Sequence, residues 1–275
     1  MSMKAHFTSA LILSGALVGS PALSALTPSF QVQGHVAGQL VADSSQTGGF
    51  NGAYTFSLSG MPASSVVLKA YLYGSAFAAQ GSANATFAGT NFGAPTNTGS
   101  DGGFTWYRWD VTGFVTVNGV HAAQLNIVGQ LYGAALGVIY NDPSLPLGDV
   151  AISDGGIELS EVFQLEQGQT IFNGFAANPG KLSVFTVGDD NSSSNERLDF
   201  NSATVGGPFD GNLGSAASLV HANVTTAGGA EVVDMYANGD HMAWQVAMLQ
   251  SAVPEPASLI ALAFGFGALA RRKAR

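Results

Sequence analysis

Short apolar runs separated by turn residues dominate this chain and restrict what it can fold into. Gly, Ser, Thr and Asn are frequent, charged residues make up only 10% of the sequence, and stretches with helical periodicity are nearly missing. Many short strands at close spacing are typical of an antiparallel sandwich or barrel. The sequence therefore predicts an all-β fold, a β-sandwich of jelly-roll type.

The expected strands are the apolar-rich runs at 30–36, 54–58, 66–73, 104–109, 122–128, 134–140, 150–152, 170–175, 182–187, 198–200 and 242–249. Glycine-rich segments at 47–52, 99–103 and 228–229 supply flexible turns. A short helical turn is expected at 110–112, with Asp110 capping free backbone amides. The run at 134–140 is long enough only for a strand, so Val138 and Ile139 are expected in the core.

The C-terminal end differs from the rest of the chain. The charge-free, mostly apolar segment 257–270 follows a short acidic proline motif and precedes a basic cluster, namely Pro254, Glu255, Pro256 and Arg271, Arg272, Lys273, Arg275. Cations beside an apolar segment stay on the cytoplasmic side of a membrane, so the body should face away from the cytoplasm. A helix of this length rises about 21 Å, less than the roughly 30 Å hydrocarbon core. The segment is therefore expected to be a transient stop and not a permanent anchor.

These three parts, in this order, resemble the PEP-CTERM sorting signal of exported proteins in Gram-negative bacteria that make extracellular polysaccharide. The resemblance covers residues 253–275. It implies that a membrane-embedded exosortase removes the tail near Pro254, Glu255 and Pro256, and passes the body to the cell surface or matrix. Association with the inner membrane would then be transient. An ordinary tail anchor behind a proline-rich linker is the alternative.

The N-terminal end fits an export route. Lys4 provides a positive start, 7–18 is apolar, and small residues interrupt the run at 19–25. This order is typical of a secretory signal peptide, which signal peptidase would remove after Ser24 or Ala25. The expected organisation is a signal peptide at 1–25, a β-sandwich ectodomain at 26–252 and the sorting signal at 253–275.

The ectodomain is strongly acidic and contains no cysteine. Residues 26–252 hold 17 acidic and four basic side chains, so the formal net charge is 4 − 17 = −13. Nucleic-acid binding is excluded because it needs clustered cations. Anionic polysaccharide would also be repelled unless divalent cations bridge the two. Disulfides and thiolate zinc sites are excluded, so stability must come from apolar burial, with or without bound metal.

A second resemblance involves the run 133–146 and its continuation from Asp149 to Asp154 and Gly155. These residues are similar to the buried strand, proline-containing loop and following strand of uncharacterised β-rich ectodomains on bacterial and archaeal surface proteins. Segments 109–112 and 174–175 lie where such domains carry similar residues. Gly148 departs from the pattern, because an Arg is frequent near that place. The resemblance spans about 64–250 and implies a fold and a surface location, with no established activity.

Catalytic motifs are sparse. The ectodomain histidines, His35, His121, His221 and His241, have no metal-ligand spacing, and no Gly-x-Ser-x-Gly elbow is present. His241 follows Asp240 with Asp234 nearby, which allows a metal or acid–base site or a solvated hairpin turn. The densest acidic stretch contains Asp154, Glu158, Glu161 and Glu166. Paired carboxylates perform glycoside hydrolysis, although carboxylates this close in sequence also fit a solvated loop.

The best candidate for an ion site is the acidic loop at 189–196. Calcium takes six to eight oxygen ligands, and Asp189, Asp190, Asn191, Asn195 and Glu196 offer many within a short stretch. The loop is not an EF-hand, because the glycine at the sixth position is missing. A calcium site and a polar connection between two strands both remain open.

The aromatic peak at 104–109 is the candidate for sugar binding. In a strand, Phe104, Trp106 and Arg108 face one way, and Thr105, Tyr107 and Trp109 face the other. Exposed Trp106, Tyr107 or Trp109 would form a platform for a sugar ring. The alternative is that one face fills the core and a neighbouring element covers the other.

Three functional hypotheses follow. The first is a noncatalytic, exported protein of the cell surface or of the extracellular, exopolysaccharide-rich biofilm matrix, with exosortase, signal peptidase and extracellular polysaccharide as partners. The second is a carbohydrate-binding module that uses the Trp106, Tyr107 and Trp109 strand. The third is a secreted glycoside hydrolase that uses the acidic stretch.

Overall fold

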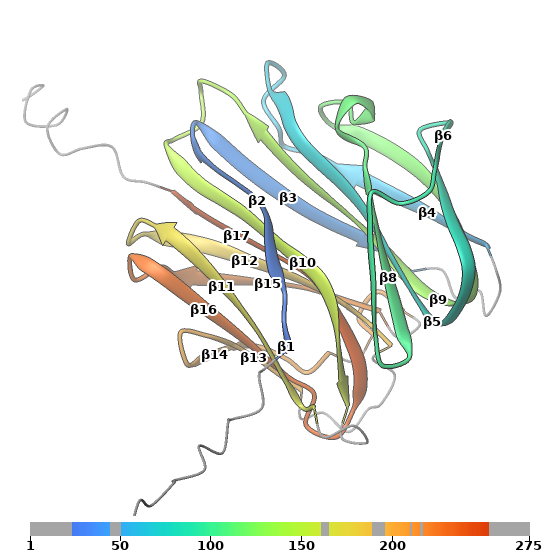
Figure 1. The fold of residues 1–275 in the computed structure, drawn as a ribbon. Helices are drawn as coiled ribbons and strands as arrows, with labels where there is room; N and C mark the ends of the chain where they lie inside the picture. Colours follow the sequence, from blue (N-terminus) through green and yellow to red (C-terminus); the bar gives the residue numbers. More distant parts are fainter. Residues whose placement is uncertain are drawn as a thin grey trace, which may run out of the picture.

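Almost every residue described by the computed structural model lies in strands or the turns between them (Figure 1). The structure describes residues 24–44, 51–160, 165–188, 196–209, 211–214 and 217–252. Within these segments the predicted all-β sandwich is confirmed, and no helix is long and apolar enough to cross a membrane. Residues 1–23 of the expected signal peptide (1–25), the expected sorting signal at 253–275 and the loop at 189–195 lie outside the described residues. The last two residues of the expected signal peptide, Ser24 and Ala25, form a short strand that pairs with residues 168–169.

In chain order the strands are β1 (Ser24–Ala25), β2 (Thr27–Gly34), β3 (Val36–Asp43), β4 (Asn51–Leu58), β5 (Val66–Phe87), β6 (Thr90–Gly93), β7 (Asn97–Asp101), β8 (Phe104–Asp110), β9 (Gly119–Asn141), β10 (Gly148–Ser160), β11 (Gln167–Phe175), β12 (Pro179–Val187), β13 (Arg197–Phe200), β14 (Ala203–Gly206), β15 (Ala217–Thr225), β16 (Gly229–Tyr236) and β17 (His241–Ala252). A 3₁₀ turn, η1 (Thr112–Phe114), follows β8. These strands form three sheets.

The first sheet has the order β3-β9-β5-β8-β7, and it folds over on itself, so we call it the folded sheet. Its two long strands, β5 and β9, continue past this path to pair with β6 and β4. Positive φ angles at Ala78 and Gly81 in β5, and at Gly129 in β9, accompany shifts of register where the strands bend. The fold encloses a core to which β4, β5, β8 and β9 all contribute.

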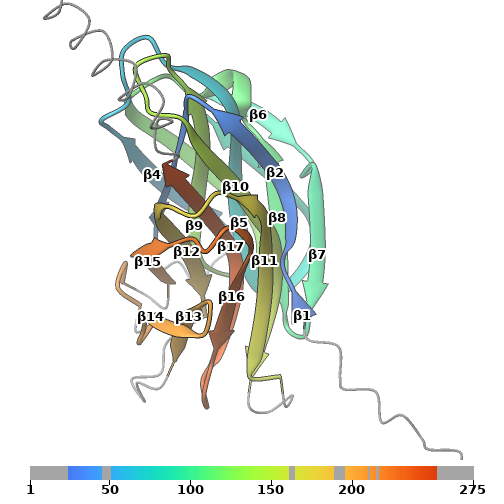
Figure 2. The same ribbon diagram turned by 90° about the vertical axis from the view of Figure 1, so that its left-hand side faces the viewer.

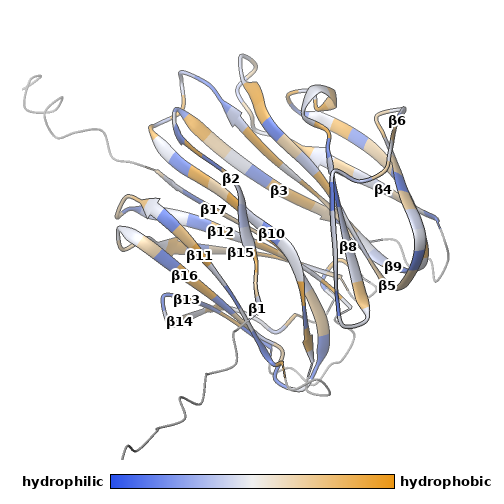
Figure 3. Cartoon of the chain, viewed as in Figure 1, coloured by the Kyte–Doolittle hydropathy of each residue, from blue (hydrophilic) through white to orange (hydrophobic). Residues whose placement is uncertain are grey.

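The second sheet, β15-β12-β17-β10-β2, is the middle sheet. It has an apolar core on each face, and β17 shows this alternation clearly: Val246 and Met248 pack toward the folded sheet, and Trp244 and Leu249 pack away from it. A strand buried on both faces needs apolar residues at nearly every position, which explains why Gln245 is the one polar residue in the run 242–249. Apolar residues accordingly spread along strands of all the sheets (Figure 3).

The third, outer sheet has the order β1-β11-β16-β13-β14 and covers the far face of the middle sheet. Phe172, Val233 and Met235 supply its inner side. The layers therefore follow one another as folded sheet, middle sheet and outer sheet (Figures 1 and 2). A groove can form at an edge where two neighbouring sheets separate, and such an edge is a suitable place for functional residues.

Several local predictions are tested by this arrangement. Val138 and Ile139 are fully buried, as predicted, and pack into different cores on opposite faces of β9. Asp110 accepts a hydrogen bond from the Thr112 amide at 3.1 Å, although the helical turn begins at Thr112 and not at Asp110. The expected strand at 30–36 is wrong as one element, because His35 separates β2 from β3.

Candidate functional site

A groove opens where β3 of the folded sheet meets β12 and β17 of the middle sheet. Two adjoining cavities, of about 330 and 380 Å³, share Ala37, Lys181 and Gln250 and make up this groove. The remaining lining residues are Val36, Gly38, Gln39, Leu40, Val41, Ser59, Tyr140, Leu145, Pro146, Leu147, Gly148, Pro179, Gly180, His221, Ser251 and Ala252. None of these lining residues is acidic, although residues 26–252 carry a large excess of carboxylates.

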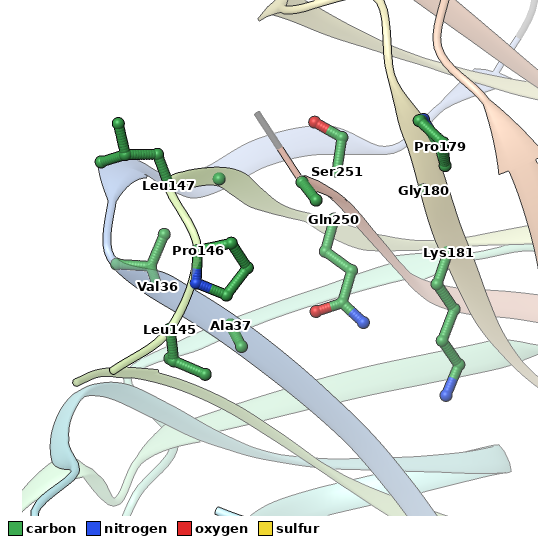
Figure 4. A pocket seen from close by; sticks show the side chains of 12 residues that line it. Val36, Ala37, Leu145, Pro146, Leu147, Pro179, Gly180, Lys181, Gln250 and Ser251 are labelled. Atoms are coloured by element: carbon green, nitrogen blue, oxygen red, sulfur yellow. The ribbon is translucent and has the colours of Figure 1, made fainter. Parts of the chain in front are cut away.

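The two sides of the groove differ in chemistry. Val36, Leu145 and Pro146 form one side, and Gln250 and Lys181 project from the neighbouring strands on the other (Figure 4). The lysine and the glutamine are register partners on β12 and β17, so the sheet itself places the two side chains together. The groove thus combines an apolar wall with hydrogen-bond donors and one cation.

The apolar wall is held by the loop between β9 and β10. Asp142 accepts hydrogen bonds from the Ser144 hydroxyl at 2.5 Å, the Ser64 hydroxyl at 2.5 Å and the Ser144 amide at 2.8 Å. These bonds, with the Ser144 hydroxyl as the largest contribution, lower the pKa of Asp142. The His35 ring nitrogen Nδ1 lies 2.6 Å from the Leu145 carbonyl oxygen. The loop therefore presents Leu145 and Pro146 in a defined position.

Lys181 differs from the other three basic side chains in residues 26–252. Lys69, Arg108 and Arg197 each lie within 3.0 Å of an aspartate oxygen, on Asp110, Asp154 and Asp199 respectively. Lys181 has no such carboxylate partner among the described residues. Its charge is therefore available to a ligand.

Two neighbours of Lys181 define the hydrogen-bonding groups in the groove. The Gln250 side-chain oxygen Oε1 accepts from the Gly38 amide at 3.0 Å, which leaves Nε2 as a donor. His221 Nδ1 lies 2.8 Å from the Ser183 hydroxyl. Burial, and then the charge of Lys181, lowers the pKa of His221, so this imidazole is neutral at neutral pH.

The acidic stretch does not come together as one site. Asp154 is buried between the folded and middle sheets, where Arg108 Nη1 approaches both its oxygens at 2.8 and 2.9 Å and the Tyr73 hydroxyl donates at 2.9 Å. Burial and then the Asp154 carboxylate raise the pKa of Tyr73 well above its ordinary value, so the phenol remains a donor. Burial alone would lower the pKa of Arg108, but its contacts with Asp154 raise it overall.

The other acids have separate partners. Buried Glu158 contacts His241 Nε2 and accepts from the Gly103 amide. Gly102, between β7 and β8, is close beside this carboxylate: its φ is +54°, and an added Cβ would collide with Glu158. Glu166 is exposed, and Glu161 lies outside the described residues.

The proposed grouping of His241 with Asp234 is not observed. Asp234 lies on β16 in the outer sheet and accepts from Gln167 and Gln169, at 3.1 and 2.9 Å. His241 is instead paired with Glu158. Sequence proximity is a poor guide here because β16 and β17 belong to different sheets.

The aromatic strand alternates as predicted but does not form a sugar platform. Tyr107 and Trp109 are buried in the core of the folded sheet, at 6% and 0% exposure. Trp106 is only partly exposed, because Gly99 and Gly156 lie against its indole ring. A sugar platform made by Trp106, Tyr107 and Trp109 is therefore wrong, since stacking requires exposed ring faces.

The candidate calcium loop is not tested. Asp189, Asp190, Asn191 and Asn195 lie outside the described residues, and Glu196 is buried just before β13. In the described part of the chain, no three His, Asp or Glu side chains are grouped to hold a metal ion.

Sequence reasoning missed the groove. Lys181 sits between Gly180 and Leu182 without a motif, and its distinguishing property is the lack of a carboxylate partner, which only the packing reveals. The sequence offered one signal: residues 26–252 contain only four basic side chains, so each of them is a candidate for binding an anionic group.

Comparisons with known proteins leave the family open. No protein-family model matches this chain, and no curated protein matches it. A peptide-N(4)-(N-acetyl-β-D-glucosaminyl) asparagine amidase is 10% identical, with 80% of this chain and 97% of that one covered at a TM-score of 0.31. The ANXUR2 extracellular domain from Arabidopsis thaliana is 7% identical, with 83% and 90% covered at 0.28. Tandem CBM51 modules of a family 98 glycoside hydrolase from Streptococcus pneumoniae are 9% identical, with 78% and 83% covered at 0.19. Similarities this low carry no argument about function.

Proposed function

We propose that this protein is a noncatalytic component of the cell surface or extracellular matrix that associates with polysaccharide through the groove between β3, β12 and β17. The observation that carries the proposal is the groove itself. It opens to solvent, joins an apolar wall to amide and ammonium donors, and has no carboxylate in its lining. Concave sites with mostly apolar walls and a few convergent polar groups are the usual places for ligands.

The partners of the buried acids also support a binding role over hydrolysis. Glycoside hydrolysis needs one carboxyl group as acid and another as base or nucleophile, both within reach of the sugar. Asp154 is held by Arg108 and Tyr73, and Glu158 by His241 and the Gly103 amide. These contacts give both carboxylates a role in joining the sheets.

The export signals complete the proposal. A signal peptide at 1–25 and a PEP-CTERM-like tail at 253–275 would deliver the ectodomain to the surface or matrix of a polysaccharide-producing cell. No part of the ectodomain would then need to act on the polymer chemically.

Fractionation of the producing cells, followed by incubation of the purified protein with their extracellular polysaccharide, tests this function. We expect the protein in the surface or matrix fraction, sedimentation with the polymer, and a polymer length that stays constant by size-exclusion chromatography. Depolymerisation that Glu158→Gln abolishes, while circular dichroism shows that the variant is folded, would instead favour the hydrolase. Recovery only from the inner membrane would contradict delivery to the matrix.

A further inference from the structure

We propose that the groove selects acidic polysaccharide, with Lys181 contacting a carboxylate of a uronic acid residue and the wall of Leu145 and Pro146 packing against the sugar ring. This inference rests on the proposed function and names the class of polymer that the groove takes. The net charge of residues 26–252 is negative and by itself would disfavour an anionic ligand, so the binding of an acidic polysaccharide needs a local explanation.

The charge argument begins with the pairing of cations. Three of the four basic side chains in the ectodomain are already bonded to aspartates, and Lys181 lies in a groove whose lining contains no acid. At about 0.15 M ionic strength the Debye length is roughly 8 Å, so exposed carboxylates elsewhere are largely screened from a ligand in the groove. A contact between Lys181 and an anion is short and less screened. The local cation can therefore outweigh the overall charge.

The neighbouring groups fit a sugar. Gln250 Nε2 lies on the strand beside Lys181, and the His221 ring lines the same part of the groove. Both offer hydrogen bonds to hydroxyl groups. Leu145 and Pro146 offer an apolar surface to the C–H face of a ring. This combination of one cation, an amide and an apolar wall matches a ring that carries both hydroxyls and a carboxylate.

An acidic peptide fits less well. An extended peptide would bind by adding a strand to the free edge of β3, where unpaired backbone groups are offered. The Gly38 amide on that edge is already bonded to the Gln250 side chain, at 3.0 Å. Strand addition would have to break this bond.

Binding of polygalacturonate to the purified full-length protein, at 150 mM NaCl with EDTA to remove calcium bridges, tests the proposal. Fully methyl-esterified polygalacturonate is the matched neutral polymer, and poly-glutamate is the acidic peptide. Wild-type protein should bind polygalacturonate at least about tenfold more tightly than either of the other two. Lys181→Gln should lose about tenfold or more in affinity, since a hydrogen bond to a charged group is worth roughly that factor.

Two variants make the result specific. Lys181→Arg keeps the charge and should retain most of the affinity, and Lys69→Gln removes a cation outside the groove and should bind as wild type. Melting curves followed by circular dichroism should show that each variant is as stable as the wild type, so that a loss of affinity does not reflect unfolding. Equal binding of the ester or of poly-glutamate, or unchanged affinity in Lys181→Gln, would overturn the selection of acidic glycans. In that case the protein would still sediment with matrix polysaccharide, so the selection of acidic glycans would be refuted while the proposed function stood. Loss of sedimentation would instead refute the proposed function itself.

Discussion

At the scale of single residues, buried ion pairs and ordinary surface pairs have different roles in this molecule. Arg108 and Asp154 join the folded sheet to the middle sheet, with side-chain exposures of 15% and 2%. Lys69 and Asp110 lie on one sheet and are more open, at 24% and 35%. The first pair is desolvated, so each partner depends on the other, whereas solvent competes for the second.

Asp154→Asn should therefore destabilise the protein by about 3–5 kcal/mol, because Arg108, whose side chain is only 15% exposed, would be left without its carboxylate partner. Lys69→Met should cost only about 0–1 kcal/mol. Urea unfolding, followed by circular dichroism, measures both. Equal costs for the two substitutions would mean that the Arg108–Asp154 pair is effectively solvated.

His121 gives a prediction about pH. It is buried on β9, stacks on Phe87 with ring centroids 5.7 Å apart, and burial lowers its pKa. The unfolded chain, with an ordinary pKa of about 6.5, takes up a proton before the folded protein does. Stability is therefore complete above about pH 6.5 and declines as the pH falls toward the lower, folded-state value. His121→Leu should lose less stability than wild type between pH 7 and pH 5.5 in urea titrations. Parallel declines in the two proteins would refute this role for His121.

At the scale of elements, the sequence predicts strands well where apolar residues are dense. It predicts them poorly where a strand consists largely of small and polar residues. The runs at 122–128 and 134–140 were expected as two strands but both belong to β9. Gly129, with a positive φ angle, and the shifts of register beside it interrupt the regular ladder without ending the strand. The strands β15 and β16 were not predicted, since their polar and small residues hide the alternation. Which sheets face one another depends on long-range packing, and so does the groove at their edge.

The two faces of β9 provide the test at this scale. Leu136 packs into the core of the folded sheet, and Ile139 packs against the middle sheet. Leu136→Ala and Ile139→Ala should each cost about 2–5 kcal/mol, through lost burial and the cavity left behind. Val120→Ala on the same strand, at a side chain 69% exposed, should change stability by about 0.5 kcal/mol or less. A large cost on only one face would contradict the stacked arrangement of the sheets.

At the scale of the whole molecule, residues 24–252 form a stack of sheets with a groove at one edge, which we propose as the polysaccharide site. Its stability rests on three apolar cores, since the chain has no cysteine for a disulfide. The sequence predicted the all-β class and the core position of Val138 and Ile139. It could not predict the groove, whose residues come mainly from β3, the loop after β9, β12 and the end of β17, with His221 from β15.

Processing of the tail is a prediction for the whole chain. Protein from the surface fraction should lack Arg271, Arg272, Lys273 and Arg275, because exosortase would cut near the proline motif. Replacing Pro254, Glu255 and Pro256 with alanine should leave an unprocessed form in the inner membrane, where the apolar segment and basic end retain it. Intact-mass spectrometry of both fractions measures this. A complete C-terminus on surface protein would rule out exosortase processing.

Hydrogen exchange of the wild-type protein, with and without the producing cells' extracellular polysaccharide, tests the central claim that the groove holds this polymer. The account predicts slower amide exchange along 36–41, 145–148, 179–181 and 250–252, with exchange in β11 and β16 unchanged. Protection confined to another face, or no protection at saturating polymer, would contradict it.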